Sequence, residues 1–194
     1  MALATCFSCQ RQTEKGFSDT ELNIINGSDS IMRVLTIEDE SDLEILRSSS
    51  TALSLAALQS EEYEKLAELM VATVTHPSQD GVGIAAPQVG INRRIVAVQR
   101  FDKEGEPFEV YPNIRIVWQS DSLAHGPEGC LSVPDRRGDV LRSQEIVIEY
   151  ADIKAVHSAT ETIPVVRDTI SGFTAVIFQH EADHLDGILY IDRL

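Results

Sequence analysis

The clearest pattern of hydrophobic and polar positions lies at residues 60–76, SEEYEKLAELMVATVTH. Ser60 can serve as an N-cap, and the glutamates that follow it interact favourably with the helix dipole. Pro77 disfavours helical backbone at the residue before it, so the helix should end near His76. The pattern predicts an amphipathic helix packed on a core. Its apolar stripe consists of Leu66, Leu69, Met70 and Val74.

Four short runs rich in β-branched residues predict strands. Polar or Gly- and Pro-containing stretches separate them, and they cover residues 93–101, 113–119, 144–153 and 160–167. The order helix, strands, helix is typical of an α+β fold.

A second helix is predicted to begin near Asp168 or Thr169 and to end at Asp186-Gly187, which provides a stop. One apolar stripe runs along it and continues into two histidines. We therefore expect a central buried helix surrounded by short mixed or antiparallel sheets. The stripe consists of Ile170, Phe173, Val176, Ile177, His180 and His184.

The second helix carries an H-E-x-x-H motif at residues 180–184. Residues four apart lie one above the other on a helix, so the rings of His180 and His184 can converge on one metal ion. Glu181 is rotated from His180 by about 100° and can reach a water on that ion as a general base. Two unrelated surface histidines would not both continue an apolar stripe.

A catalytic site of this kind needs a third protein ligand and an open position. Only Asp186 and Asp192 follow the motif, so the third ligand is expected upstream. A thiolate is a strong ligand for a borderline ion, which favours Cys130, although a free cysteine is also a common buried apolar residue. The candidates are His76, His125, His157, Glu128 and Cys130.

Composition limits the remaining possibilities. The 194 residues fit one domain, or one domain with an appendage, and a formal net charge of −15 argues against a large surface for nucleic acid. No apolar run reaches the roughly 20 residues of a membrane-spanning helix. Residues 1–30 are polar and predict a flexible N-terminal extension, in which Cys6 and Cys9 are interpreted as ordinary cysteines.

Three stretches, read together, resemble the signature motifs of the peptide deformylase family. They are GVGIAAPQVG at residues 81–90, EGCLSVP at 128–134 and QHEADHLDG at 179–187. The family's motifs are commonly written G-x-G-[LI]-A-A-x-Q, E-G-C-[LV]-S and Q-H-E-x-D-H-L-x-G. The order also agrees, and the resemblance covers residues 31–194, which we expect to form the catalytic domain.

The resemblance implies a role for individual residues. It makes Glu181 the general acid/base, with Gln88 and the backbone N–H of Leu131 as donors to the reacting oxygen. Fe(II) is the expected ion, although Zn(II), Ni(II) or Co(II) can replace it in a purified sample. The implied metal ligands are Cys130, His180 and His184. The residues expected to border the substrate are Gly83, Ile84, Gly129 and Ile177, with Phe178 as an alternative to Ile177.

The family removes the N-formyl group from the N-terminal formylmethionine of newly synthesised polypeptides. The implied reaction is attack of a metal-bound water on the formyl carbon, with Glu181 accepting the proton and passing it to the leaving amine. The expected partners are nascent chains and, transiently, the ribosome, but neither a membrane nor nucleic acid. A cytoplasmic protein is favoured over an exported one, because the start MALATC lacks the charged and apolar segments of a signal peptide.

Two other functions fit parts of the pattern. A different H-E-x-x-H peptidase is disfavoured by the missing downstream ligand, and a metal-binding protein without catalysis by the presence of Glu181 and Gln88. The resemblance also suggests an ion pair between Glu128 and Arg142. Asp183 either steadies a ligand or pairs on the helix surface.

Overall fold

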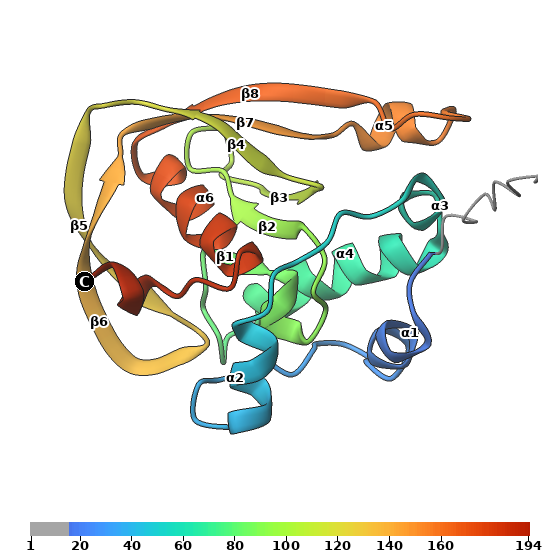
Figure 1. Cartoon of the computed structure of the whole chain (residues 1–194), viewed down its shortest axis with the longest axis horizontal. Coiled ribbons are helices and arrows are strands. Elements are labelled where there is room, and N and C mark those ends of the chain that lie inside the picture. The colour runs from blue at the N-terminus through green and yellow to red at the C-terminus, as the bar shows by residue number, and fades with distance from the viewer. Residues whose placement is uncertain (1–15) are drawn as a thin grey trace, which may run out of the picture.

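Four helices come first along residues 16–194, the part of the chain described by this computed structural model, and the strands and then helix α6 follow them (Figure 1). Cys6 and Cys9, interpreted above as ordinary cysteines, lie outside the described residues. The helices are α1 (Asp19–Asn26), α2 (Glu40–Leu46), α3 (Leu55–Leu58), α4 (Glu61–Val74), α5 (Ile153–Val156) and α6 (Gly172–Leu185), with 3₁₀ turns η1 (Ala86–Val89) and η2 (Tyr190–Arg193). The strands are β1 (Gly83–Ala85), β2 (Ile95–Gln99), β3 (Phe108–Pro112), β4 (Arg115–Gln119), β5 (Leu123–Cys130), β6 (Val133–Ser143), β7 (Glu145–Ala151) and β8 (Val165–Ser171).

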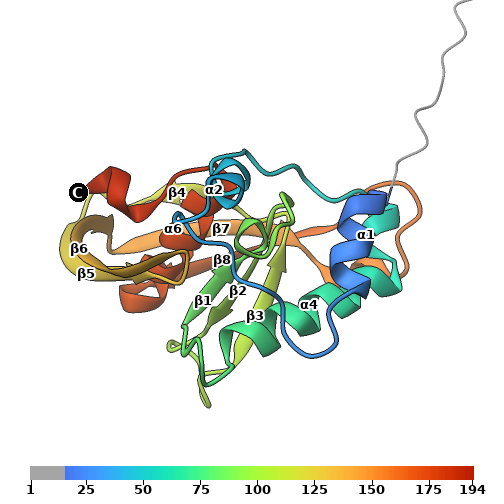
Figure 2. The ribbon, with the colours of Figure 1, turned by 90° about the horizontal axis from the view of Figure 1, so that it is seen from below.

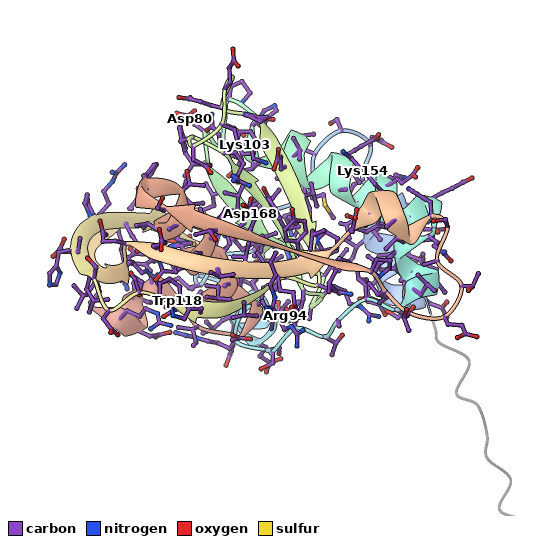
Figure 3. The ribbon with its side chains drawn as sticks, turned by 90° about the horizontal axis from the view of Figure 1, so that it is seen from above. Asp80, Arg94, Lys103, Trp118, Lys154 and Asp168 are labelled. Atoms are coloured by element: carbon purple, nitrogen blue, oxygen red, sulfur yellow. The ribbon has the colours of Figure 1, made fainter. Side chains whose placement is uncertain are left out.

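The strands form three small sheets with the orders β1-β2-β3, β4-β7-β8 and β5-β6. Every pairing between these strands is antiparallel, which confirms the predicted α+β fold with short sheets. The β7–β8 hairpin crosses the molecule as a long ribbon, with Asp168 near its middle and Lys154 at its α5 end (Figure 3). The β5–β6 hairpin curves around the side of the molecule next to the C-terminus (Figure 1).

Strand β2 separates two parts of the core, because successive side chains of a strand point to opposite faces. Ile95 and Ala97 pack in the cluster that contains the α4 residues Leu66 and Met70. Val96 and Val98 pack instead in a cluster with residues of α6. The sheet of β1, β2 and β3 is therefore covered by apolar side chains on both faces. Helices α4 and α6 lie on opposite sides of this sheet (Figure 2).

Helix α4 confirms the first helix prediction, including its start. The Ser60 hydroxyl caps the helix by accepting a hydrogen bond from the backbone N–H of Tyr63. Its predicted apolar stripe is buried.

The second predicted helix begins later than expected, at Gly172 instead of Asp168 or Thr169. Residues 165–171 continue strand β8 because they pair in register with β7, from Ala151–Val165 to Glu145–Ser171. Gly172 has a φ of 65°, a conformation that suits glycine and turns the chain from strand into helix. Ile170 consequently belongs to the strand, and Phe173 is 56% exposed instead of buried.

A helix also forms within the expected extension 1–30. In α1, Ser18 and Glu21 form a reciprocal capping box, and Glu21 pairs with Arg93 at 2.6 Å. Ile25 is fully buried in the α4 side of the core. The Glu21–Arg93 pair and the apolar side chains of Ile24 and Ile25 thus attach residues 19–26 to the rest of the molecule.

Candidate metal centre

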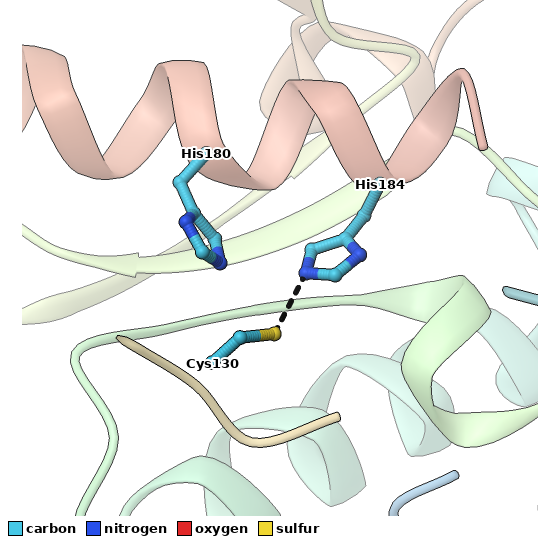
Figure 4. A group of neighbouring side chains, drawn as sticks. All are labelled: Cys130, His180 and His184. Atoms are coloured by element: carbon cyan, nitrogen blue, oxygen red, sulfur yellow. Dashed lines mark hydrogen bonds between the residues drawn. The ribbon is translucent and has the colours of Figure 1, made fainter. Parts of the chain in front are cut away.

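Three side chains from two distant segments converge beside α6. Cys130 ends strand β5, whereas His180 and His184 lie one turn apart on the helix (Figure 4). One potential ligand atom from each residue lies within 4.8 Å of the other two. The Cys130 Sγ is 3.2 Å from the His184 Nε2. Of the five upstream candidates, the geometry thus brings Cys130 to the two imidazoles and places its sulfur beside them.

The His180 ring is oriented by Glu128. Its Nδ1 lies 2.7 Å from the Glu128 Oε2, so Nδ1 donates a proton to that carboxylate and Nε2 is the ring nitrogen left to bind an ion. Burial raises the pKa of Glu128, but hydrogen bonds from His180 and Arg142 outweigh it and lower that pKa to about 2. Glu128 is therefore a charged support for a ligand, not a third ligand.

The neighbours of His180 favour a positive charge on its ring. Burial lowers the pKa of His180, but Cys130 and Glu128 outweigh burial and raise that pKa to about 10. Burial and the charge of His180 lower the pKa of His184, which keeps that ring neutral, as a ligand must be. One thiolate and two imidazoles suit Zn, Fe and related ions. The residues present therefore fit a divalent cation.

Behind Glu128 lies a buried ion-pair network. Arg142 donates to both carboxylate oxygens of Glu128, at 2.8 and 3.0 Å, which confirms the predicted pair. A third donor of Arg142 reaches Asp183 at 2.6 Å. Arg193 makes two bonds of 2.5 Å to the same Asp183. Asp183 thus joins α6 to the C-terminal turn, a connection that the sequence pattern did not predict.

Glu181 is enclosed next to the cluster and is 4% exposed. Within residues 16–194, its Oε2 has no hydrogen-bond partner, which is unusual for a buried carboxylate and leaves an acceptor for a bound group. Burial raises the pKa of Glu181 to about 7. A Cβ at Gly83 would lie 2.8 Å from the Ile177 side chain and closer still to Glu181, so only glycine fits there.

The amide of Gln88 is fixed at both ends. Its Oε1 accepts a hydrogen bond from the backbone N–H of Ala85 at 2.8 Å. This directs its Nε2 toward Ser132 at 3.2 Å and the Cys130 sulfur at 3.5 Å. The only side-chain donors of Gln88 therefore face the candidate centre.

A cleft of about 740 Å³ opens over the cluster. It contains most of the predicted site residues, namely Gly83, Gln88, Gly129, Cys130, Leu131, Ile177, His180 and Glu181. Ile84 differs, because its side chain is fully buried in the α4 side of the core. Phe178 is also fully buried, so Ile177 is the member of that pair that faces the cleft.

Some lining residues were not predicted to lie at the cleft. Arg136 and Arg137 reach it from the β5–β6 hairpin, and Phe173 borders it because α6 begins later than expected. The proximity of Arg136 and Arg137 to the cleft depends on the curvature of the hairpin, which no local motif encodes.

The remaining histidines are exposed. His125 pairs with Asp139 at 2.8 Å, and His76 hydrogen-bonds Ser78. His157 is the C-cap residue of α5, the short helix that connects β7 and β8. Among residues 16–194, no helix combines the length and apolar character needed to cross a membrane.

Comparisons with known proteins find relatives of this chain. The family model described as polypeptide deformylase matches residues 31–194. A peptide deformylase of Leptospira biflexa is 35% identical over 158 residues, covering 77% of this chain and 82% of that protein. Peptide deformylase 2 of Gloeobacter violaceus is 40% identical over 136 residues, covering 69% and 67%. The Met-Ala-Ser-bound crystal structure of a class I type b peptide deformylase from Acinetobacter baumannii has a TM-score of 0.71 and 34% identity, covering 84% of this chain and 98% of that one.

Proposed function

The chain belongs to the polypeptide deformylase family, and from this premise we propose that it hydrolyses the N-formyl group of formylmethionine at the start of newly synthesised polypeptides. The observation that carries the proposal is the convergence of Cys130, His180 and His184 beside the buried carboxylate of Glu181. The cleft over this group is open enough to admit a peptide end. The Acinetobacter relative bound to Met-Ala-Ser supports a peptide that starts with methionine as the product.

Residues 31–194 form the catalytic domain in this proposal, and residues 1–30 are an appendage to it. Cys130, His180 and His184 would hold one divalent ion, for which Fe(II) is the expected identity. Such an ion supplies Lewis-acid chemistry when bound, because it polarises a carbonyl and lowers the pKa of water. The helix with the H-E-x-x-H motif would thus contribute two ligands and the proton-transfer group.

Glu181 is proposed to move the proton. A pKa of about 7, raised by burial, lets the carboxylate accept a proton from water near neutral pH and then deliver it to the leaving amine. Its unpartnered Oε2 is free for this transfer. Gly83 keeps the space beside Glu181 clear of any side chain.

Developing charge on the formyl oxygen requires donors. Gln88, whose amide is fixed by Ala85, is proposed to donate to that oxygen together with the backbone N–H of Leu131. One such donor typically contributes ~2.7–4 kcal/mol in the transition state. Gly83 and Gly129 are proposed to approach the peptide backbone, and Ile177 to contact the methionine side chain.

The test is hydrolysis of formyl-Met-Ala-Ser by protein loaded with Fe(II) or Ni(II), measured as released formate. An unformylated peptide of the same sequence is the control substrate, and chelated protein is the control enzyme. Release of formate only by the loaded protein is expected. Cleavage of internal peptide bonds without formate release would instead identify a different H-E-x-x-H peptidase, and no turnover by loaded protein would remove the proposal.

The biological partners follow from the same chemistry. Nascent chains with a formylated first residue are the proposed substrates, with transient contact to the ribosome that makes them and a cytoplasmic location. The net charge of −15 gives no reason to propose direct binding to nucleic acid.

A further inference from the structure

The C-terminal turn η2 is attached to the rest of the molecule by two arginine–aspartate pairs. Arg47, just after α2, forms a two-point pair with Asp192. Arg193 forms a two-point pair with Asp183 on α6. The two arginines are similarly exposed, at 38% and 41% of their side chains. They resemble each other locally but differ in what lies beyond their carboxylates.

The pair made by Arg193 continues inward to a metal ligand. Asp183 also accepts from Arg142, which donates twice to Glu128, and Glu128 holds the Nδ1 of His180. Each of these bonds lies between 2.6 and 3.0 Å. The pair made by Arg47 ends on Asp192, whose Oδ2 otherwise accepts only from the nearby backbone N–H of Leu189 among the described residues.

We propose, on the basis of the metal centre argued above, that Arg193 is a positioning residue which fixes the His180 ring through Asp183, Arg142 and Glu128. It touches neither substrate nor ion. Nothing in the H-E-x-x-H motif requires it.

The physical reason is shared use of one carboxylate. Arg193 occupies both oxygens of Asp183, which orients that carboxylate toward Arg142. Beside Arg193, the Asp183 side chain is 11% exposed, so without that partner it can rotate toward water and the third anchor of Arg142 becomes loose. The two bonds from Arg142 to Glu128 then lose their fixed geometry, and the His180 ring gains rotational freedom. Groups that orient a ligand in this way commonly control how tightly the metal is held.

The test compares Arg193→Ala with Arg47→Ala in the full chain. Both variants remove one positive charge and one anchor of η2, and Arg47→Ala also removes a hydrogen bond to the carbonyl of Gly187. An effect of charge or anchoring alone should therefore be at least as large in Arg47→Ala. Each protein is loaded with Co(II), and its release into excess chelator is followed by the visible absorption of bound Co(II). This readout is independent of deformylation.

Arg193→Ala should release Co(II) about 3- to 10-fold faster than the parent and shift the Co(II) spectrum, less than the ~10–100-fold typical of a direct ligand partner. Arg47→Ala should stay within about twofold of the parent. Arg193→Lys, which keeps the charge but makes a less rigid pair, should lie between the parent and Arg193→Ala.

Equal release from Arg193→Ala and Arg47→Ala would overturn the inference, because η2 would then only need to be anchored. Parent-like release from Arg193→Ala would overturn it as well. A parent protein that binds no Co(II) would overturn the proposed metal centre and this inference together. A metal-binding parent without formate release would remove only the proposed reaction.

Discussion

Two buried arginines lie against helix α6, and each gathers several acceptors. Arg142 bonds Glu128 and Asp183, and its side chain is 5% exposed. The side chain of Arg100 is 3% exposed, and its guanidinium lies over the ring of Phe178 in α6. The acceptors of Arg100 are Asp102, Asp168 and the hydroxyl of Tyr111.

The two arrangements differ in where they end. The carboxylates bound by Arg142 are themselves buried, at 5% and 11% exposure, and Glu128 continues to His180, a proposed metal ligand. The carboxylates paired with Arg100 are those of Asp102, Glu109 and Asp168, which are 29%, 35% and 34% exposed. Its guanidinium also lies over the rings of Tyr111 and Phe178. A buried, charge-paired arginine is therefore not in itself a sign of a functional site. Whether such an arginine belongs to a functional site depends on the group at the end of its network.

Removing a single carboxylate should give the largest difference in turnover between the candidate centre beside Arg142 and the surroundings of Arg100. Glu181→Gln should lower formyl-Met-Ala-Ser turnover by roughly 10²–10⁴-fold, because proton transfer loses its acceptor. Metal content, measured by elemental analysis, should not change, since Glu181 is not a ligand. Asp102→Asn, next to Arg100, is the matched control and should retain turnover within about twofold. A Glu181→Gln variant with near-parent turnover would exclude the proposed proton transfer.

Replacing the arginines themselves tests the comparison directly. Arg142→Met should destabilise the fold by ~3–5 kcal/mol, because Glu128 and Asp183 are left as buried unpaired charges. Arg100→Met should cost about 1–3 kcal/mol, since its carboxylates can be hydrated. Only Arg142→Met should also lose Ni(II) during dialysis.

Urea unfolding and metal analysis measure both effects, and Arg142→Lys serves if the methionine variant does not fold. Equal metal retention in the Arg142 and Arg100 variants would mean that the network behind Glu128 does not support the ligand.

The sequence predicts the parts of the molecule that local chemistry specifies. The H-E-x-x-H spacing places two ligands on one helix face whatever the rest of the chain does. Ser60 and the apolar stripe after it likewise specify α4. The pairing of Glu128 with Arg142 was expected only from a family resemblance, and the structure confirms it.

Other features depend on contacts between distant segments. Residues 168–171 continue an apolar stripe, yet pairing with β7 makes them a strand. Strands β5 and β6 contain Gly, Pro and charged residues and were not among the predicted strands, but they pair with each other along their length. The Arg193–Asp183 pair joins residues ten apart whose side chains meet only once the chain after α6 has turned back. No local pattern records any of these.

A smaller effect is expected from the close approach at Gly83. Gly83→Ala introduces a methyl group next to Ile177 and Glu181 and should displace the carboxylate, lowering turnover by roughly 10²-fold, as misplaced catalytic groups do. Gly126→Ala is the control, because a Cβ there meets no atom within 4 Å. Equal turnover of both variants would show that Glu181 tolerates a shift, and metal content separates this effect from ligand loss.

The smallest effect concerns acid stability of the metal-free protein. The pKa of Glu128 is about 2 in the folded state against an ordinary value of 4.5, so its stabilisation is complete above pH 4.5 and is lost as the pH falls toward 2. Below the ordinary His180 value of 6.5, that ring is protonated in both the folded and unfolded states and adds no slope. Glu128→Gln should therefore flatten the decline of the unfolding free energy between about pH 4.5 and pH 3, measured by urea titration.

Asp102, whose pKa is lowered mainly by its bonds to Arg100, provides the comparison. Asp102→Asn should flatten the same decline less, because its carboxylate is 29% exposed and hydration already stabilises its charge in the unfolded and folded states alike. An equal or larger flattening by Asp102→Asn would contradict the expectation that the unfolding free energy depends more on the charge of Glu128 than on that of Asp102. The two carboxylates would then differ in what they adjoin, but not in how strongly the fold depends on their charge.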